Sequence, residues 1–239
     1  MLGEIMQEYL EILTGLDWSP LFITIKTAIA ATIVAFFIGI AVAYWVMKAN
    51  TKLKSVIDGL LTLPMVLPPT VAGFVLLLLF SRRRPLGMWL ETTFDIQIVQ
   101  TWTGCVIAAF VIAFPLMYRN ARAAFEQMDI NLLHAGRTLG MSEFKIFRSV
   151  IIPTAGPGIA SGTILTFARA MGEYGATTML AGNIAGKTAT ISQQIAMVMK
   201  DGDYFTAGIW VVIILIIAFV ILFLMNYVVG KSMKHIKRW

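Results

Sequence analysis

The sequence has few charged side chains, a single cysteine and only two histidines. Asp, Glu, Lys and Arg make up 13% of its 239 residues, whereas 58% are hydrophobic. A soluble domain carries about 25% charged residues, so this chain has too little polar surface to fold as a soluble protein. Its hydrophobicity excludes intrinsic disorder. The lone Cys105 excludes a disulfide framework and a cysteine metal site, which leaves the class of integral membrane proteins.

The few charges divide the sequence into long apolar stretches. A helix needs about 20 apolar residues to cross a hydrocarbon core about 30 Å thick. Residues 188–199 are too short, and would add a sixth span only with help from neighbouring helices. The expected fold is an all-α integral membrane domain over residues 20–230. Five stretches are long enough and predict transmembrane helices at about residues 22–47, 60–81, 97–118, 151–172 and 205–230.

The distribution of Lys and Arg predicts the orientation in the membrane. Residues 1–19 carry acidic side chains but no Lys or Arg, which suits an extracytoplasmic segment lying on the membrane surface. Residues 231–239 are basic, and so are residues 48–58 and 119–148 between the spans. Positive charge accumulates on the cytoplasmic side, so we expect a multi-pass inner-membrane protein with its N-terminus outside and its basic C-terminal tail inside. Residues 82–84, all Arg, do not fit this scheme.

One polar segment between the third and fourth spans has the pattern of two short helices. Asp129 can cap a helix over about residues 130–139, because its carboxylate can accept free amide protons of the first turn. Gly140 then stands where a left-handed residue would end that helix.

A second short helix is expected to follow at once. Ser142 can cap it, and its apolar face would consist of Phe144, Phe147 and Ile151. Two helices joined at a glycine and placed between spans predict a docking site for another protein. The alternative is an amphipathic loop that rests on the lipid headgroups.

The same segment resembles the EAA signature of ABC-importer permeases. It keeps the spacing of that signature through Gly140 and Pro153, with His134 in place of the Glu and Gly136 in place of an Ala. By this resemblance, residues 129–152 are the coupling segment that inserts into a groove of a separate ATPase subunit. The expected coupling residues are Asp129, His134, Ala135, Gly136, Arg137, Thr138, Leu139, Gly140 and Phe144.

Three further motifs, at residues 63–69, 168–177 and 181–188, resemble the permease subunit of molybdate importers, the ModB family. Sulfate and tungstate permeases share parts of them. The resemblance implies a type I importer permease with a MetI-like transmembrane domain. It implies import of a tetrahedral oxyanion, with molybdate favoured and tungstate or sulfate as alternatives. The implied partners are a second copy of the chain, two ATP-binding cassette subunits that hold Mg-ATP, and an extracytoplasmic oxyanion-binding protein, while this chain itself binds no cofactor.

Prolines at the start of the second span mark candidate pathway or gate residues. Pro64, Pro68 and Pro69 remove backbone donors, so the stretch through Leu67 and Thr70 is not expected to be a regular helix. In a membrane such backbone survives only where it is buried in protein or lines a water-filled path. The alternative is that the prolines mark a helix start at the membrane edge.

Charged and small residues in the fourth span leave two questions open. Arg169 and Glu173 are four residues apart on one helix face, and they form either a structural ion pair or part of an anion site at Arg169. Gly158 and Gly162 permit close helix packing, either within the subunit or across a dimer.

The sequence shows no arrangement typical of a catalytic site. Residues 181–188 approach a P-loop, but Ala181 replaces its first Gly and membrane spans flank it. We therefore expect a translocation subunit and not an enzyme. The net charge of +6 needs no nucleic-acid partner, because the basic residues cluster at span ends beside the lipid. The alternative function, a secondary transporter or channel without an ATPase, predicts matching repeats, which five spans do not provide.

Overall fold

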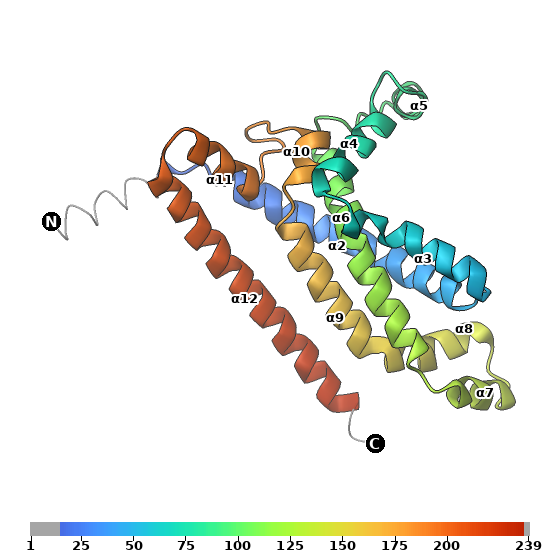
Figure 1. Ribbon diagram of the computed structural model, residues 1–239. Coiled ribbons are helices and arrows are strands. Elements are labelled where there is room, and N and C mark those ends of the chain that lie inside the picture. The colour runs from blue at the N-terminus through green and yellow to red at the C-terminus, as the bar shows by residue number, and fades with distance from the viewer. Residues whose placement is uncertain (1–14, 237–239) are drawn as a thin grey trace.

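The computed structural model describes residues 15–236, and every regular element in that range is a helix (Figure 1). This confirms the all-α prediction. Residues 1–14 and 237–239, most of the expected surface segment and the end of the basic tail, lie outside the described residues. Among the described residues, four helices are long and apolar enough to cross a membrane, namely Ser19–Met47 (α2), Trp102–Glu126 (α6), Glu143–Met171 and Tyr204–Tyr227 within α12 (Tyr204–Ile236).

The predicted span at residues 60–81 is not one straight helix. Two helices, α3 (Thr51–Val66) and α4 (Pro69–Phe80), occupy this region and meet at an angle of 110°. Pro64 lies inside α3, so the expectation that this proline prevents regular helix is wrong. One proline removes a single backbone hydrogen bond, which a helix can tolerate.

The bend occurs at Leu67, directly before Pro68. The Pro68 ring disfavours helical backbone in the preceding residue. Leu67 accordingly adopts an extended conformation, with φ −70° and ψ 145°, and α3 ends there. Pro69 then starts α4, where its missing N–H leaves no hydrogen bond unmade. The consecutive prolines therefore divide the predicted span into two helices.

The core of the bundle lies around α6, which packs against both α2 and α9 (Ile152–Met171). Small side chains form much of the contact between α2 and α6. Ala28 and Ala31 of α2 belong to the same buried cluster as Ala109 and Ala113 of α6. Without a hydrophobic force to drive helices together in lipid, such close contacts between small residues supply the packing.

The two glycines of α9 contact α6 within the same subunit. A Cβ atom at Gly158 would lie 2.5 Å from Ala124 Cβ, and one at Gly162 would lie 2.7 Å from Asn120 Cβ. Both distances are far below van der Waals contact. The small-residue pair therefore serves intrasubunit packing, which resolves the alternative that the sequence left open.

Short elements gather at the two ends of the spans (Figure 1). At one end lie α5 (Pro85–Phe94), α10 (Gly175–Ala181) and α11 (Ile191–Lys200). At the other end lie α7 (Ile130–Thr138) and α8 (Glu143–Ile146), which continues through a π-helix at Phe147–Ile151 into α9. We call these the loop end and the coupling end.

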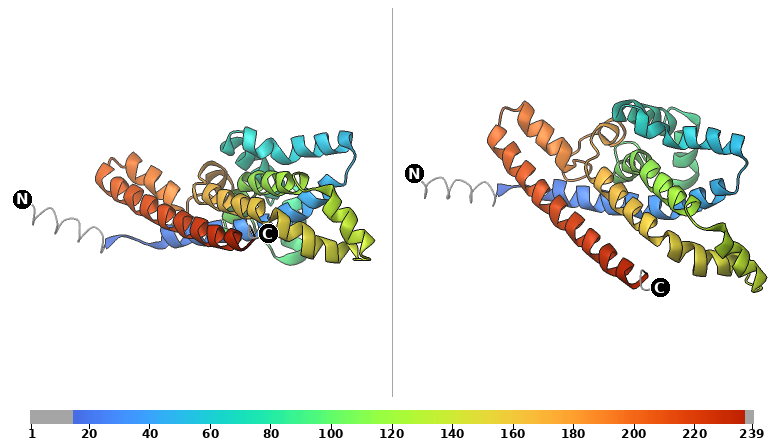
Figure 2. Two further views of the ribbon diagram at one scale, coloured as in Figure 1. Left: turned by 90° about the horizontal axis from the view of Figure 1, so that it is seen from below. Right: turned by 60° about the horizontal axis from the view of Figure 1, so that its bottom comes forward.

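α11 folds back along α12 at the loop end (Figure 2). It has 10 residues, and at about 1.5 Å per residue it is too short to cross a membrane by itself. α12 continues to Ile236, beyond the predicted end of the fifth span at residue 230, so part of the expected tail is helical.

One of the three consecutive arginines has a structural role at the loop end. Arg82 Nε lies 3.3 Å from Glu91 Oε1 of α5, and the Arg82 guanidinium also donates to Gln97 Oε1. These contacts hold α5 against the segment that leads into α6.

Candidate functional site

The coupling segment, residues 129–152, has the local structure that its sequence predicts. Asp129 Oδ1 accepts the N–H of Asn131 at 2.9 Å and so caps α7. Gly140 has a φ of +72°, a left-handed conformation that favours glycine. Ser142 Oγ accepts the N–H of Lys145 at 3.3 Å and caps α8. Both predicted caps and the left-handed glycine are confirmed.

α7 and α8 are joined by a tight turn. Gly136 is the buried residue of α7, and a Cβ atom there would lie 3.1 Å from Ile146 Cγ1. Its carbonyl accepts the N–H of Met141 at 3.1 Å. The departure from the EAA signature at Gly136 thus coincides with a close approach of α7 to Ile146, where a larger residue would have to displace that side chain.

Polar contacts on the surface add to this turn. Arg137 Nε lies 2.8 Å from Glu143 Oε1, so an ion pair joins the two helices. The hydrogen bond from Arg137 to Glu143 raises the pKa of the guanidinium. Thr138 Oγ1 donates to the carbonyl of His134 at 3.0 Å. His134, Ala135 and Leu139 are all exposed, so most of the predicted coupling residues face outward.

The coupling end exposes large apolar side chains. Leu139 is 79% exposed, Phe144 is 73% exposed and Ile130 is 62% exposed. Of the three residues predicted to form one apolar face, Ile151 is buried and Phe147 is half-buried, but Phe144 is exposed. The prediction is therefore wrong for Phe144, and Ile146 of the same short helix is buried instead. A π-helix at Phe147–Ile151 also changes the helical register between Phe144 and Ile151.

The second candidate site is the proline junction, where the first turn of α4 meets the first turn of α10. A Cβ atom at Gly175 would lie 3.0 Å from Pro69 Cβ and 3.1 Å from the backbone N of Thr70. A Cβ atom at Gly73 would lie 2.6 Å from Ala176 Cα. The motifs at residues 63–69 and 168–177 are therefore in direct backbone contact, although about a hundred residues separate them.

Glu173 fixes the α10 side of the proline junction. The residue is only 2% exposed, and its Oε1 accepts the N–H of Ala176 at 2.7 Å, which caps α10. Its Oε2 lies 3.0 Å from Arg169 Nη1. This geometry favours the structural ion pair over a free anion site at Arg169, because the carboxylate already occupies the guanidinium.

The remaining predicted pathway residues are more dispersed. Pro64 lies in α3, before the bend and away from Glu173. Leu67 is half-buried and Pro68 is exposed at the bend itself, and Thr70 is exposed just beyond it. The structure thus brings Pro69 and Thr70 to the α10 turn that Glu173 caps, and leaves Pro64 in another helix.

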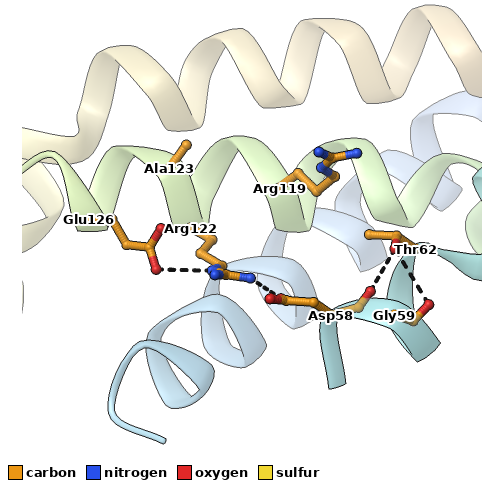
Figure 3. Close-up of a pocket in the computed structure, with 7 residues that line it drawn as sticks. All are labelled: Asp58, Gly59, Thr62, Arg119, Arg122, Ala123 and Glu126. Carbon is orange, nitrogen blue, oxygen red and sulfur yellow. Dashed lines mark hydrogen bonds and ion pairs between the residues drawn. The ribbon is translucent and has the colours of Figure 1, made fainter. Parts of the chain in front are cut away.

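A charged cluster between α3 and α6 was not predicted. Arg122 pairs with Asp58, and its Nε lies 3.1 Å from Glu126 Oε1 (Figure 3). Lys54 also pairs with Glu126, and the Tyr118 hydroxyl donates to Asp58. The signals were the spacing of Arg122 and Glu126, four residues apart, and the single acidic residue within an apolar stretch at Asp58.

The motif at residues 181–188 forms a closed loop at the loop end. Thr188 is fully buried, and its Oγ1 accepts the N–H of Ile184 at 2.9 Å. Its hydroxyl therefore serves the fold of the loop. Within residues 15–236, His, Cys, Asp and Glu side chains form no group of three or more that could hold a metal ion.

A bundle of apolar helices with a paired-helix protrusion at one end defines an integral membrane component of a transporter. Residues 35–235 match the family described as binding-protein-dependent transport system inner membrane component. The match spans most of the sequence, and the chain belongs to this family.

Individual relatives are named as permease proteins of transport systems. The chain is 39% identical over 180 residues to the molybdenum transport system permease protein ModB of Escherichia coli (strain K12), covering 75% of this chain and 79% of that protein. It is 31% identical over 220 residues to the sulfate transport system permease protein CysT of the same strain, covering 92% and 79%. A structure of the MetNI methionine ABC transporter in an inward-facing conformation matches with a TM-score of 0.72 at 18% identity, covering 92% of this chain and 97% of that one. The fold is that of type I ABC importer permeases.

Proposed function

We propose that this chain is the membrane-spanning subunit of an ATP-driven importer for a tetrahedral oxyanion, with molybdate as the favoured cargo. The single observation that carries the ATPase-driven mechanism is the coupling end. There, a capped helix pair presents Leu139 and Phe144 to the surroundings, each more than 70% exposed. Exposed apolar residues rimmed by polar ones are typical of a protein interface.

The rigidity of the coupling segment supports a mechanical role. The ion pair between Arg137 and Glu143 and the contact of Gly136 with Ile146 hold α7 and α8 together. α8 then continues without a break into α9, which packs along α6 in the core. A displacement of α7 and α8 by an ATPase subunit would therefore be transmitted to the bundle.

In this mechanism, two ATPase subunits close on ATP and pull the coupling segments of two permease copies. The spans tilt, and a path opens toward a loaded binding protein on the loop-end side. ATP hydrolysis then returns the bundle to its inward-facing state. The permease supplies two conformations, and coupling is the free energy that links nucleotide state to their populations. This places the coupling end and the C-terminus in the cytoplasm, with the N-terminus outside.

An exposed apolar face on α3 and α4 supports a homodimer. α3 has no buried residue, and its Val56, Leu60 and Val66 are all more than 60% exposed. α4 also exposes large apolar side chains, among them Phe74 and Leu78. A cysteine introduced at Val66 is expected to form a crosslink between two copies in native membranes, while one at Phe219, on the exposed side of α12, should not. Equal crosslinking at both positions would argue that α3 faces lipid.

The cargo assignment rests on the relatives. Molybdate, tungstate and sulfate are all tetrahedral dianions, and the chain resembles permeases named for molybdenum and for sulfate. The higher identity to the molybdenum permease favours molybdate. Uptake of the three anions in a strain that lacks its own permeases, together with the affinities of the cognate binding protein, would decide among them.

The ATPase-coupled function is tested at the coupling end. The double substitution Leu139→Ser and Phe144→Ser should abolish co-purification of an ATPase subunit, because it removes the exposed apolar contacts. Gly140→Pro should abolish uptake, because proline cannot adopt the φ of +72° found there. Membrane insertion should stay normal in both variants.

The matched control is Met88→Ser, which changes a residue of α5 that is 52% exposed at the opposite end. It should leave ATPase binding intact. If no ATPase subunit co-purifies with the wild-type chain and Gly140→Pro transports normally, the chain works as a secondary transporter or channel instead.

A further inference from the structure

The charged cluster between α3 and α6 encloses a hollow of about 430 Å³ (Figure 3). Its lining consists of Asp58, Gly59, Thr62, Arg119, Arg122, Ala123 and Glu126. Charged residues make up only 13% of the chain, yet four of the seven lining residues are charged. The large apolar side chains that dominate the rest of the protein are missing from this lining. Such a hollow is suited to water and to a charged ligand.

The charges around this hollow do not balance. Arg122 pairs with both carboxylates, Asp58 and Glu126, and Lys54 pairs with Glu126 as well. These four groups neutralise one another. Arg119 is the surplus cation, because it is exposed and has no hydrogen bond or ion pair with any residue of the described range 15–236.

The geometry leaves the Arg119 guanidinium accessible. Figure 3 shows it apart from the ion pairs, one turn of α6 before Arg122. Gly59 lines the hollow without a side chain, and a Cβ atom placed there would meet nothing within 4 Å, so the space beside it is open. Thr62 Oγ1 already donates to the Asp58 carbonyl at 2.6 Å, so the arginine supplies the donors for a ligand. A guanidinium presents several N–H groups in a planar fork that matches two oxygens of an oxyanion.

The location matches the direction of transport in the proposed function, on which this inference rests. The hollow lies near the C-terminal end of α6, and the coupling segment begins at Asp129, directly after that helix. It is therefore on the side to which an importer delivers its cargo. An exposed arginine with carboxylates nearby holds a dianion weakly, and weak binding permits rapid release.

From these observations we propose that Arg119 is the primary contact of an oxyanion-binding subsite at the cytoplasmic exit, which takes the imported tetrahedral dianion. The phosphate of an anionic lipid headgroup offers the same chemistry to the same guanidinium. The subsite is therefore defined by its oxyanion chemistry, and the lipid source must be tested beside the cargo.

The test uses the full-length permease with its ATPase subunits in nanodiscs of neutral phosphatidylcholine. The probe is radiolabelled molybdate, measured by equilibrium binding at low salt and without the binding protein. Arg119→Gln should weaken binding about tenfold or more, the loss expected for a charge-assisted hydrogen bond. The molybdate affinity of Arg119→Lys should lie between those of the wild type and Arg119→Gln, because lysine keeps the positive charge but lacks the planar fork of N–H groups. Binding should weaken as salt is added.

The matched control is Arg83→Gln, which removes an exposed arginine at the loop end, outside both the hollow and the coupling segment. It should bind molybdate like the wild type. If Arg119→Gln proves unstable, Arg119→Lys decides the outcome. Equal binding by the Arg119 variants and the control, in both the molybdate and the lipid measurements, would overturn the proposal.

The lipid source is tested with the same variants in nanodiscs that contain phosphatidylglycerol, by mass spectrometry of retained lipid. Loss of bound phosphatidylglycerol in Arg119→Gln, with no molybdate binding in neutral lipid, assigns the oxyanion subsite to the headgroup. Uptake by the wild-type complex is measured in parallel. Oxyanion uptake without any Arg119-dependent binding defeats only the subsite, whereas absence of oxyanion uptake defeats the proposed function.

Discussion

The coupling end and the proline junction differ in how exposed their residues are and in how far apart in the sequence their contacts lie. At the coupling end most candidate residues are exposed, and the contacts that shape the turn lie within one short stretch of sequence, between residues 129 and 146. At the proline junction, Glu173 is 2% exposed, and the close contacts of Gly73 with Ala176 and of Gly175 with Pro69 join segments about a hundred residues apart. A surface that another protein must grip has to be exposed, whereas a bend within the membrane needs buried partners for its backbone.

This contrast predicts that substitutions at the proline junction destabilise the whole bundle, whereas substitutions at the coupling end have smaller effects that stay local. Glu173→Ala should have the largest effect. It leaves the buried Ala176 N–H without its acceptor, which costs about 1–3 kcal/mol, and it removes the carboxylate from Arg169, whose side chain is 34% exposed, which adds up to about 1 kcal/mol. The measurement is thermal unfolding of the purified protein in detergent.

Glu173→Gln serves as the control, because it keeps an acceptor for Ala176 and should lose less stability. Combining it with Arg169→Gln separates the two roles of Arg169. Restored stability and transport would establish a structural pair. Restored stability without transport would show that Arg169 is part of the anion path.

Gly73→Val should have the next largest effect. Its side chain would meet the backbone of Ala176, which cannot move unless α10 shifts, and overpacking of this kind costs about 1–3 kcal/mol. Gly156→Ala in α9 is the matched control, because a Cβ atom there meets nothing within 4 Å. The control should be neutral or should stabilise by up to about 1 kcal/mol. Similar melting temperatures for the two variants would contradict the close contact.

Gly140→Ala should have a smaller effect, for a different reason. A Cβ atom at Gly140 also meets nothing within 4 Å, but the φ of +72° costs an alanine about 1–2 kcal/mol. Hydrogen exchange should show faster opening confined to residues 130–146, with α6 and α9 unchanged. If exchange accelerates throughout the bundle, the coupling segment is not separable from the core in this way.

Arg137→Ala should have the smallest effect on stability. Arg137 and Glu143 are both about half exposed, and exposed ion pairs contribute little to stability because solvent screens them. A double-mutant cycle with Glu143→Ala measures the coupling energy directly. A coupling energy as large as the effect of Gly140→Ala would show that this pair, and not the backbone turn, fixes the angle between α7 and α8.

Local sequence signals predicted the coupling end well. Asp129, Gly140 and Ser142 act through backbone groups only a few residues away, so their roles can be read from spacing. Phe144 was placed wrongly, because tertiary packing buries Ile146 of the same short helix in the core and leaves Phe144 exposed. The bend at Leu67 followed from the proline pair, but its angle of 110° did not, since that angle depends on what α4 packs against.

The proline junction and the charged cluster could not be assembled from the sequence. Spacing indicated that Arg169 and Glu173 could pair, but not that Glu173 caps α10. Likewise, Asp58 and Arg122 are 64 positions apart, and only the packing of α3 beside α6 brings them together. Interactions across helices depend on relative rotation and height, and periodicity within one helix fixes neither.

The sequence by itself determined that this is a helical membrane protein, roughly where its helices run, and how the coupling segment is capped. These properties follow from hydrophobic length and from hydrogen bonds over a few residues, which are local. The tertiary structure alone decided that Gly158 and Gly162 contact α6, that the proline motif meets the α10 turn, and that Arg119 has no partner among residues 15–236 beside neutralised charges. Those outcomes depend on how helices distant in sequence are packed, because the partners of a side chain in a membrane are set by its neighbouring helices.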